Sequence, residues 1–541
     1  LALALLRHRG LALARPAPAP APAPACFGPG RQSSRRRSTA ARGGRAGSMP
    51  APTGAGTGTG TGTGTGAAAA SALSLPSFLE RAWEGLLPPA GTAPGAGRYH
   101  VTLGNEAGDA DSIVSALVHG LVLDLEGGDA DGGEGADGAL IVPLVGIPRA
   151  DLPLRRETTL LLGMAGVDVG RLLCLDGPPP VPELLSPATA AAAAAGAGAG
   201  EGGTPPELRV PLLDHNRIRP PLAHLSGSVV EILDHHEDEG DHPHVEGEAR
   251  QVAFEGRSAV VGSTCTLVAE RLMRACTSSR TGQGPSSEPS SGNRPLDPSA
   301  SLALLGVILL DTMDMSEEAG KGTGRDLAAI EGLLERTDWG RLDHASMDGS
   351  AEGAVFDAGR EHRPDRAALH GLLSRSKFDP AFWAEMSAWD CLRIDHKRFE
   401  PGGSDRGDRP PVPFGMASVL LPLSEMASKP DFAESVRRWL LPSEDGGACV
   451  PLLVVLSMTL VDGKPRREML LAGPPDLVDS AADYLVGGAE ASFLEIAEEE
   501  DMVPEVEGSA EGLRMRAFRQ GNPKGSRKQV APVLLKFAAS L

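Results

Sequence analysis

Four apolar runs in this chain each end at acidic residues, and this pattern constrains the fold more than any other feature. The runs cover Tyr99–Leu103, Leu208–Leu213, Val229–Leu233 and Leu304–Leu310. None of them alternates strictly between apolar and polar residues, which is typical of strands covered on both faces by helices. The apolar residues of Asp111–Leu123 have helical spacing, and Ala139–Val145 follows as a further strand candidate. The alternation predicts an α/β fold with a parallel sheet.

Carboxylates stand where each of the four runs ends. Asp109 and Asp111 follow the first run, and Asp214, Asp234 and Asp311 follow the other three. Ligands of an open parallel sheet bind outside the carboxyl ends of its strands, so we expect these side chains to converge. Carboxylates a few ångströms apart repel one another unless cations neutralise them. Carboxylates together with His235 suit Mn²⁺, Mg²⁺ or Co²⁺, and an aspartate that bridges two such ions suits phosphoryl chemistry.

Each of these residues also has a purely structural interpretation. A single Asp after a strand is more often a helix N-cap, roughly two times in three. The His242 and His244 side chains are better interpreted as loop residues than as ligands. Four acidic strand ends in one consistent context favour a metal site over the structural interpretation.

Composition limits the class of partner. The chain has 541 residues and a formal net charge of -20, which argues against nucleic acid or an anionic membrane as a partner. A polyanionic ligand would need cations and a local basic cluster. No apolar run reaches the length of a membrane span. Six scattered cysteines lack zinc-site or redox spacing, which favours reduced thiols in a cytosol-like compartment.

The chain divides into four regions by composition. Residues 1–70 are predicted to be a disordered or targeting segment, and 71–345 a parallel-sheet α/β domain. Low-complexity insertions near 178–206 and 277–297 are predicted to be surface loops of that domain. A third insertion at 402–411, further along the chain, is also predicted to be a surface loop. Residues 346–376 are predicted to be a linker. A smaller α/β domain with a mixed sheet follows at 377–541, and we expect the active site in the cleft between the two domains.

The second domain has four strand candidates of its own. They are Gly415–Leu421, Leu452–Leu460, Glu468–Leu471 and Val530–Phe537. At the other end of the chain, residues 1–48 contain no acid and nine arginines between Arg7 and Arg45. That composition fits a chloroplast or mitochondrial transit peptide, but the first methionine is Met49, so an upstream-translated segment fits equally well. The protein is otherwise expected to be cytoplasmic.

Short motifs in both domains resemble the DHH phosphoesterase superfamily, and within it the exopolyphosphatase and prune proteins. Segments 104–112, 212–216, 232–239 and 309–315 are similar to the four motifs of the DHH domain. Residues 147–158 resemble the segment between the first two motifs. Segments 377–379, 392–397 and 526–532 resemble the DHH-associated second domain, and the last is similar to the Ser-Arg-Lys motif of family II inorganic pyrophosphatases. The resemblance covers roughly residues 72–541 apart from the insertions.

The resemblance implies two divalent metal ions, Mn²⁺ or Mg²⁺, with Co²⁺ as a further candidate. The implied metal ligands are Asn105, Asp109, Asp111, Asp214, His235 and Asp311. Asp214 would bridge the two ions, and Asp234 would orient its neighbours. Family II pyrophosphatases carry His where this chain has Asn105, whereas exopolyphosphatases and prune proteins share Asn. An amide binds metal more weakly than imidazole.

The resemblance also implies which residues hold the substrate. His236, Arg527 and Lys528 are the implied catalytic residues and contact the phosphates, and Arg393 and Lys397 are further substrate-binding candidates. Solvated helix charge is an equally good interpretation of the last two. Asp314 stands where relatives usually carry Asn, and it adds a negative charge near the site.

The function implied is that of an exopolyphosphatase, which releases orthophosphate from the ends of inorganic polyphosphate. Two divalent ions would lower the pKa of water, so no protein general base is required. One alternative is a short-chain polyphosphatase or inorganic pyrophosphatase, and another is a prune-like cyclic nucleotide phosphodiesterase. A non-catalytic interaction protein on the same scaffold is the alternative from another class. The sequence does not fix the oligomeric state.

Overall fold

The computed structural model describes residues 74–86, 97–127, 138–177, 181–194, 207–256, 258–277, 294–344, 347, 350–357, 362–401, 412–441, 450–461, 464–499 and 512–541. All of them belong to one compact unit of the chain, Gly66–Leu541. The segment predicted to be disordered or targeting, residues 1–70, lies outside the described residues.

The first domain is built on a six-stranded sheet in which every pair of neighbours is parallel. In spatial order its strands are β3 (Leu173–Cys174), β2 (Leu140–Val145), β1 (Arg98–Gly104), β4 (Glu207–Leu213), β5 (Val229–Asp234) and β6 (Arg250–Val252). The chain order therefore reverses between β1 and β4, which makes their carboxyl ends the topological switch point of the sheet. The predicted parallel-sheet α/β fold is confirmed.

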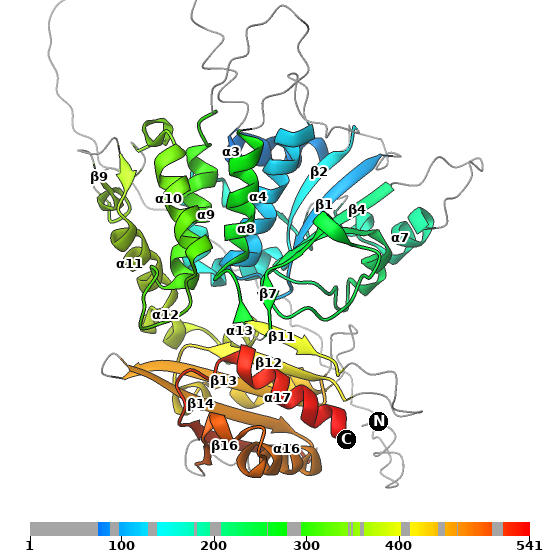
Figure 1. Cartoon of the computed structure of the whole chain (residues 1–541). Coiled ribbons are helices and arrows are strands. Elements are labelled where there is room, and N and C mark those ends of the chain that lie inside the picture. The colour runs from blue at the N-terminus through cyan, green and yellow to red at the C-terminus, as the bar shows by residue number, and fades with distance from the viewer. Residues whose placement is uncertain are drawn as a thin grey trace, which may run out of the picture. The chain divides into compact units, whose positions relative to one another are not determined.

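Helices cover both faces of this sheet. On one face a large apolar cluster joins α3 (Leu75–Leu86), α4 (Ala110–Gly127), α5 (Arg156–Met164), α8 (Thr264–Ala275), α9 (Pro298–Thr312), α10 (Gly324–Arg336) and α11 (Arg366–Lys377). Helices α4, α8, α9 and α10 pack side by side there (Figure 1). A second cluster on the other face includes α6 (Val181–Leu184). Burial on both faces explains why the strands lack polar alternation.

The second domain contains a separate mixed sheet. In spatial order its strands are β11 (His396–Phe399), β12 (Phe414–Val419), β13 (Leu452–Val461), β14 (Lys464–Gly473), β16 (Arg514–Gln520) and β15 (Ile496–Glu498). Only β12 and β13 pair in parallel. One face packs on α16 (Pro475–Gly487) and α17 (Arg527–Ser540), the other on α12 (Pro380–Glu385), α13 (Ala388–Arg393), α14 (Leu423–Ala427) and α15 (Phe432–Leu440). The predicted second α/β domain with a mixed sheet is confirmed.

One predicted strand of the first domain is wrong. Leu304–Leu310 lies within helix α9, whose residues Pro298–Leu310 are all buried. A helix that is apolar all round shows no amphipathic period, so its apolar run cannot be told from a buried strand by periodicity. The start signal is in the sequence: Asp297 accepts a hydrogen bond from the Ala300 N–H at 2.9 Å, and Pro298 occupies the first turn.

One predicted strand of the second domain is also wrong. Val530–Phe537 lies within helix α17, which begins with a capping box between Ser526 and Gln529. Pro532 lies inside this segment. A proline argues against a central strand, and Ser-x-x-Gln before an apolar run is a helix start, so both signals favoured the helix.

Two predicted connecting regions contain ordered structure. Within 178–206, two short helices form, α6 and α7 (Pro187–Ala194), and Val181 and Leu184 are buried against the first sheet. Helix α11, inside the proposed linker, packs Leu369 and Leu373 into the core of the first domain. The four cysteines in the described part of the chain are free.

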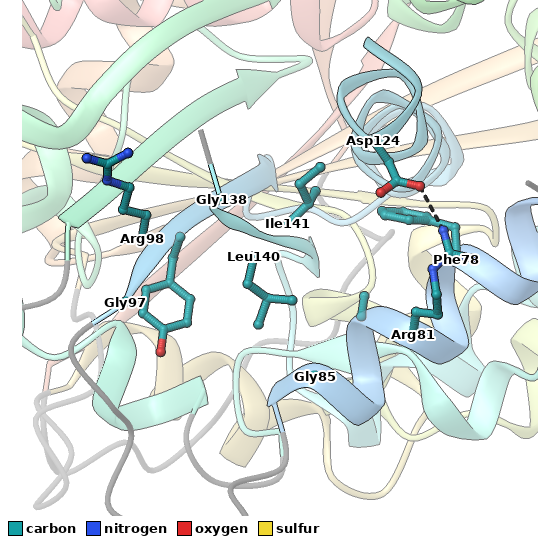
Figure 2. A pocket seen from close by; sticks show the side chains of 11 residues that line it. Phe78, Arg81, Gly85, Gly97, Arg98, Asp124, Gly138, Leu140 and Ile141 are labelled. Atoms are coloured by element: carbon teal, nitrogen blue, oxygen red, sulfur yellow. Dashed lines mark hydrogen bonds and ion pairs between the residues drawn. The ribbon is translucent and has the colours of Figure 1, made fainter. Parts of the chain in front are cut away.

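None of the described helices combines the length and apolar character needed to cross a lipid bilayer. A pocket of about 450 Å³ lies between α3 and the first residues of β1 and β2 (Figure 2). An ion pair between Arg81 and Asp124 at 2.7 Å spans one side of it. Gly97 and Gly138 line this pocket and directly follow chain segments outside the described residues. None of the predicted site residues lines it.

A largely buried polar triad, separate from the predicted site residues, stabilises the first domain. The Glu231 carboxylate on β5 contacts His119 Nε2 on α4 at 2.7 Å and also the Arg271 guanidinium on α8. Burial raises the pKa of Glu231, but the effects of His119 and Arg271 outweigh that of burial and lower the pKa to about 2. The ordinary pKa of this carboxyl is 4.5, so the triad stabilises the fold above about pH 4.5 and loses that contribution as the pH falls toward 2.

We therefore predict that E231Q destabilises the protein by about 3 kcal/mol near neutral pH, and that the difference from wild type shrinks as the pH falls from about 5 to 3. Urea unfolding of both proteins in a chelator, over that pH range, measures it. E248Q, at an exposed glutamate of the same domain, is the control. A difference between wild type and E231Q that stays constant with pH would contradict the assignment.

Candidate metal centre

The candidate site lies where β1, β4 and β5 end. Asn105 follows β1, Asp214 follows β4, and His235 and His236 follow β5. Since β1 and β4 flank the reversal of strand order, these residues stand at the ligand-binding position typical of open parallel sheets.

Asp214 is held at the centre of the site. Its side chain is only 2% exposed, and its backbone is left-handed with φ of 64°. One carboxylate oxygen accepts a hydrogen bond from Asn105 Nδ2 at 2.7 Å, and the other accepts one from Thr264 Oγ1 at 3.3 Å. The Asn105 Oδ1 atom accepts the Ala107 N–H within its own loop. Asn105 thus orients Asp214 in this arrangement, and its service as a metal ligand stays a prediction.

Asp111 is fixed by the N-terminus of helix α8. Its carboxylate accepts hydrogen bonds from Ser263 Oγ at 2.7 Å and from the backbone N–H groups of Thr264 and Cys265, both at 2.8 Å. Helix N-termini carry unsatisfied N–H groups and a partial positive charge, which suits a carboxylate. Burial and the neighbouring Asp109 nevertheless raise the pKa of Asp111.

Asp234 organises the two histidines that follow it. One of its oxygens accepts the N–H groups of His235 and His236 and also His236 Nδ1 at 2.8 Å; the other accepts Asn216 Nδ2 at 2.6 Å. Burial raises the pKa of Asp234, but His236 lowers it more, so the net shift is downward. Asp234 is fully buried and therefore acts as a fixed anion that orients His235 and His236.

Among the described residues, Asp214, His235 and His236 form a group of possible ligand atoms that all lie within 4.8 Å of one another. His235 Nε2 lies 3.5 Å from an Asp214 oxygen and 3.8 Å from an Asp111 oxygen. His235 Nδ1 lies 3.2 Å from the Val261 carbonyl, so this ring can donate there and present Nε2 as a free lone pair. His236, predicted only as a substrate contact, thus lies among the donor atoms.

Asp311 and Asp109 complete the acidic surroundings. Asp311 lies in the last turn of α9 rather than after a strand, and its Oδ2 atom is buried without a hydrogen-bond partner among the described residues. Burial and Asp111 raise the pKa of Asp311 to about 8, against the opposing effect of Lys377. Asp109 accepts the Ser112 N–H at 3.0 Å at the start of α4. Its charge also raises the pKa of Asp214.

These residues fit a bound divalent cation. Crowded carboxylates with raised pKa values are unfavourable in the folded protein unless positive charge is supplied. The unpartnered Asp311 oxygen and the His235 Nε2 lone pair are donors that Mn²⁺, Mg²⁺ and Co²⁺ accept. The buried Asp-His-His group could therefore bind a metal ion.

The predicted cations lie at different distances from this group. Lys528 Nζ, at the start of α17, lies 3.5 Å from His235 Nε2. Arg527 instead pairs with Asp395 at 2.8 Å, and Arg393 pairs with Asp151 of the first domain and with Asp390. Burial raises the pKa of the half-buried Glu106, but Lys397 and other cations lower it more, so the net shift is downward. The roles of these four residues in substrate binding stay predictions.

Several residues near the site were not singled out from the sequence. Ser263 and Thr264 anchor Asp111 and Asp214, and an N-cap serine before an apolar helix was the available signal. Lys377, which begins one of the second-domain motifs, lies 3.6 Å from Glu157 and acts electrostatically on Asp311. Lys321 lies in a loop with no sequence signal.

Asp314, the residue that departs from the expected Asn, is accounted for by a neighbouring arginine. Its Oδ1 atom accepts hydrogen bonds from Arg366 Nε at 3.1 Å and Nη2 at 2.8 Å. Met313, Asp314 and Met315 are all left-handed, with φ of 53°, 51° and 61°. The ion pair therefore ties this tight turn after Asp311 to the start of α11 and neutralises the extra charge.

The fold and the site define a two-domain α/β protein with an acidic, histidine-containing metal-binding group at a sheet switch point. No family model matches this chain. Three mammalian relatives named "Exopolyphosphatase PRUNE1" match most of it: the bovine protein is 30% identical over 438 residues, and the rat and human proteins are each 29% identical. Each match covers 80% of this chain and 74% of the relative. The chain belongs to the family of these PRUNE1 proteins.

Removing one of the crowded carboxylate charges is expected to have opposite effects with and without metal. Without metal, D311N removes a charge that repels the neighbouring carboxylates. We therefore predict that its free energy of unfolding is about 1 to 3 kcal/mol higher than that of wild type. Saturating Mn²⁺ stabilises wild type by ligand linkage, and D311N gains less.

Thermal unfolding in chelator and in Mn²⁺ measures both effects. D168N, at an exposed helix cap outside the site, should respond to Mn²⁺ as wild type does. Equal Mn²⁺-induced stabilisation of wild type and D311N would contradict a role for Asp311 at the centre.

Proposed function

We propose that this protein is an exopolyphosphatase, which hydrolyses the terminal phosphoanhydride bond of inorganic polyphosphate and releases orthophosphate. The observation that carries the proposal is the contact between the two domains at the site: Lys528 Nζ of the second domain lies 3.5 Å from His235 Nε2 in the acidic group of the first. Anionic ligands that bind metal need this combination of carboxylates and cations. The names of the PRUNE1 relatives support the same activity.

Two divalent cations, Mn²⁺ or Mg²⁺, would be held by Asp109, Asp111, Asp214, His235 and Asp311, with Asn105 beside them. When bound, such ions supply Lewis acidity and make water a stronger nucleophile at neutral pH. Asp214 lies between Asn105 and His235, which suits it to contact both ions. We also propose that the first domain is a DHH domain, as its sequence motifs suggest.

The reaction adds water across a P–O–P linkage, so the terminal phosphorus gains a new oxygen and the shortened chain leaves with the bridging oxygen. Lys528 would stabilise negative charge at the terminal phosphate. Arg527 is held against Asp395, from which its guanidinium can present remaining N–H groups to phosphate oxygens. His236, fixed by Asp234, contacts the phosphate or leaving group from the β5 side.

Other cations contribute through charge. Lys397 and Lys377 act electrostatically on Asp395, and Lys377 also acts on Asp311. Arg393 is engaged by Asp151 and Asp390, and this contact connects the domains. We propose that Arg393 mainly holds the second domain near the site.

A substrate panel tests the proposal. We predict phosphate release from long-chain polyphosphate with Mn²⁺ or Mg²⁺ and none in chelator, and we predict that D214N loses at least about 100-fold in kcat because it disturbs the central ligand. Pyrophosphate, tripolyphosphate and a cyclic nucleotide complete the panel.

The control variant is E248Q, because Glu248 is exposed and is not one of the proposed site residues. Turnover of the cyclic nucleotide alone would replace the proposal with the phosphodiesterase alternative. Metal binding without turnover of any phosphate compound would favour the non-catalytic alternative.

A further inference from the structure

One arginine of the first domain is buried and bound to main-chain atoms. Arg155 stands between the short helix η1 (Arg149–Leu154) and α5, and only 2% of it is exposed. Its guanidinium donates hydrogen bonds to the carbonyls of Ala107 at 2.5 Å, Gly108 at 3.1 Å and Asp151 at 2.9 Å. Burying a guanidinium is costly unless hydrogen bonds compensate. The position of Arg155 is therefore tied to the two chain segments that supply these carbonyls.

The first of these segments is the loop between β1 and α4, which carries the predicted metal ligands Asn105 and Asp109. The loop turns at Gly108, whose φ is 55° and where an added Cβ would come 2.5 Å from Ile147 Cγ2. Within the loop, the Ala107 N–H donates to Asn105 Oδ1 at 2.9 Å. The buried guanidinium binds the two carbonyls directly before Asp109, and so fixes the backbone from which that carboxylate projects.

The second segment, η1 and the residues that follow it, is where the second domain rests on the first. The Asp151 carboxylate pairs with the Arg393 guanidinium on α13. Leu154 packs against an apolar cluster of the second domain. Arg156 pairs at 2.7 Å with Asp379, the N-cap of α12. Three residues of this short segment therefore contact the second domain, while the buried guanidinium among them contacts the metal-ligand loop.

We propose that Arg155 is a positioning residue, which couples the seating of the second domain to the placement of Asn105 and Asp109. The second domain holds η1 through Asp151, and Arg155 transmits the position of η1 to the loop. The inference rests on the proposed function and makes it more specific, because it names the contact through which the domain that carries Lys528 acts on the metal ligands. A lysine cannot replace this arginine, since one ammonium lacks the planar fork that reaches two separate segments.

The first experiment measures hydrogen exchange of the loop amides in chelator, without metal or substrate. R155K keeps the charge and loses the fork of donors, so residues 106–110 are expected to exchange about tenfold faster than in wild type. Residues 264–275 of α8 should change less than about twofold, because other contacts hold that helix. R171Q, at an exposed arginine that pairs with Glu80, is the matched control and should exchange as wild type does in both segments.

A second variant acts at the far end of the contact. D151N removes the charge that Arg393 binds and leaves the backbone carbonyl in place. Exchange of residues 106–110 is expected to rise about threefold in D151N, and the double variant is expected to match R155K, because both substitutions act along one path. Additive effects would overturn the coupling. Should R155K fail to fold, D151N decides alone, and unchanged loop exchange in D151N would overturn the proposal.

Metal binding separates a positioning role from a purely structural one. Titration with Mn²⁺ is expected to show binding to R155K about tenfold weaker than to wild type, with R171Q unchanged. A folded R155K that is less stable than wild type in chelator, yet binds Mn²⁺ with wild-type affinity, would make Arg155 a structural residue only and overturn the proposal.

Failure of the proposed function is recognised separately. A wild type that hydrolyses no phosphate compound would overturn the exopolyphosphatase proposal, while loop exchange and Mn²⁺ affinity would still decide the role of Arg155. Active wild type, together with an R155K variant that matches it in loop exchange and Mn²⁺ affinity, would overturn the positioning role and leave the function standing.

Discussion

Mutual repulsion among buried carboxylates is the interaction on which the rest of this structure depends. Asp111, Asp214 and Asp311 lie close enough for each to be affected by another of the three or by Asp109, and burial removes the solvent that would screen them. The protein tolerates this unfavourable repulsion at one edge of the first sheet, where fixed hydrogen-bond donors orient the acids. A bound divalent cation would offset this repulsion by coordinating the same carboxylates.

The fold places these acids by three separate means. The order of the sheet brings the ends of β1 and β4 together at the switch point, which juxtaposes Asn105 and Asp214. The N-terminus of α8 fixes Asp111, and Asp234 fixes the two histidines. A second domain then contributes Lys528. The overall net charge of -20 is therefore compatible with an anionic ligand, because Lys528 contacts the acidic group and Lys377 acts electrostatically on Asp311.

The sequence predicted the parallel sheet and the approach of Asp111, Asp214 and His235 to one another, because buried strands and their terminal acids leave a local signature. Asp214 and His235 could be assigned to strand ends directly, since β4 and β5 are short apolar runs. Asp311 was placed after a strand and lies instead in the last turn of α9, because a fully buried helix has no period to distinguish it. Its place near Asp111 survived the error, since a helix end can reach the same edge of a sheet.

Other features depend on tertiary contacts that no local pattern encodes. The Asp314 and Arg366 pair joins residues far apart in the chain, and the approach of Lys528 to His235 requires both domains. The number of metal ions bound per chain tests the central claim most directly, by equilibrium dialysis against Mn²⁺ with metal analysis. Two ions per wild-type chain and fewer in D214N are expected. No bound Mn²⁺, or equal binding by both proteins, would contradict an acidic centre built to hold a pair of cations.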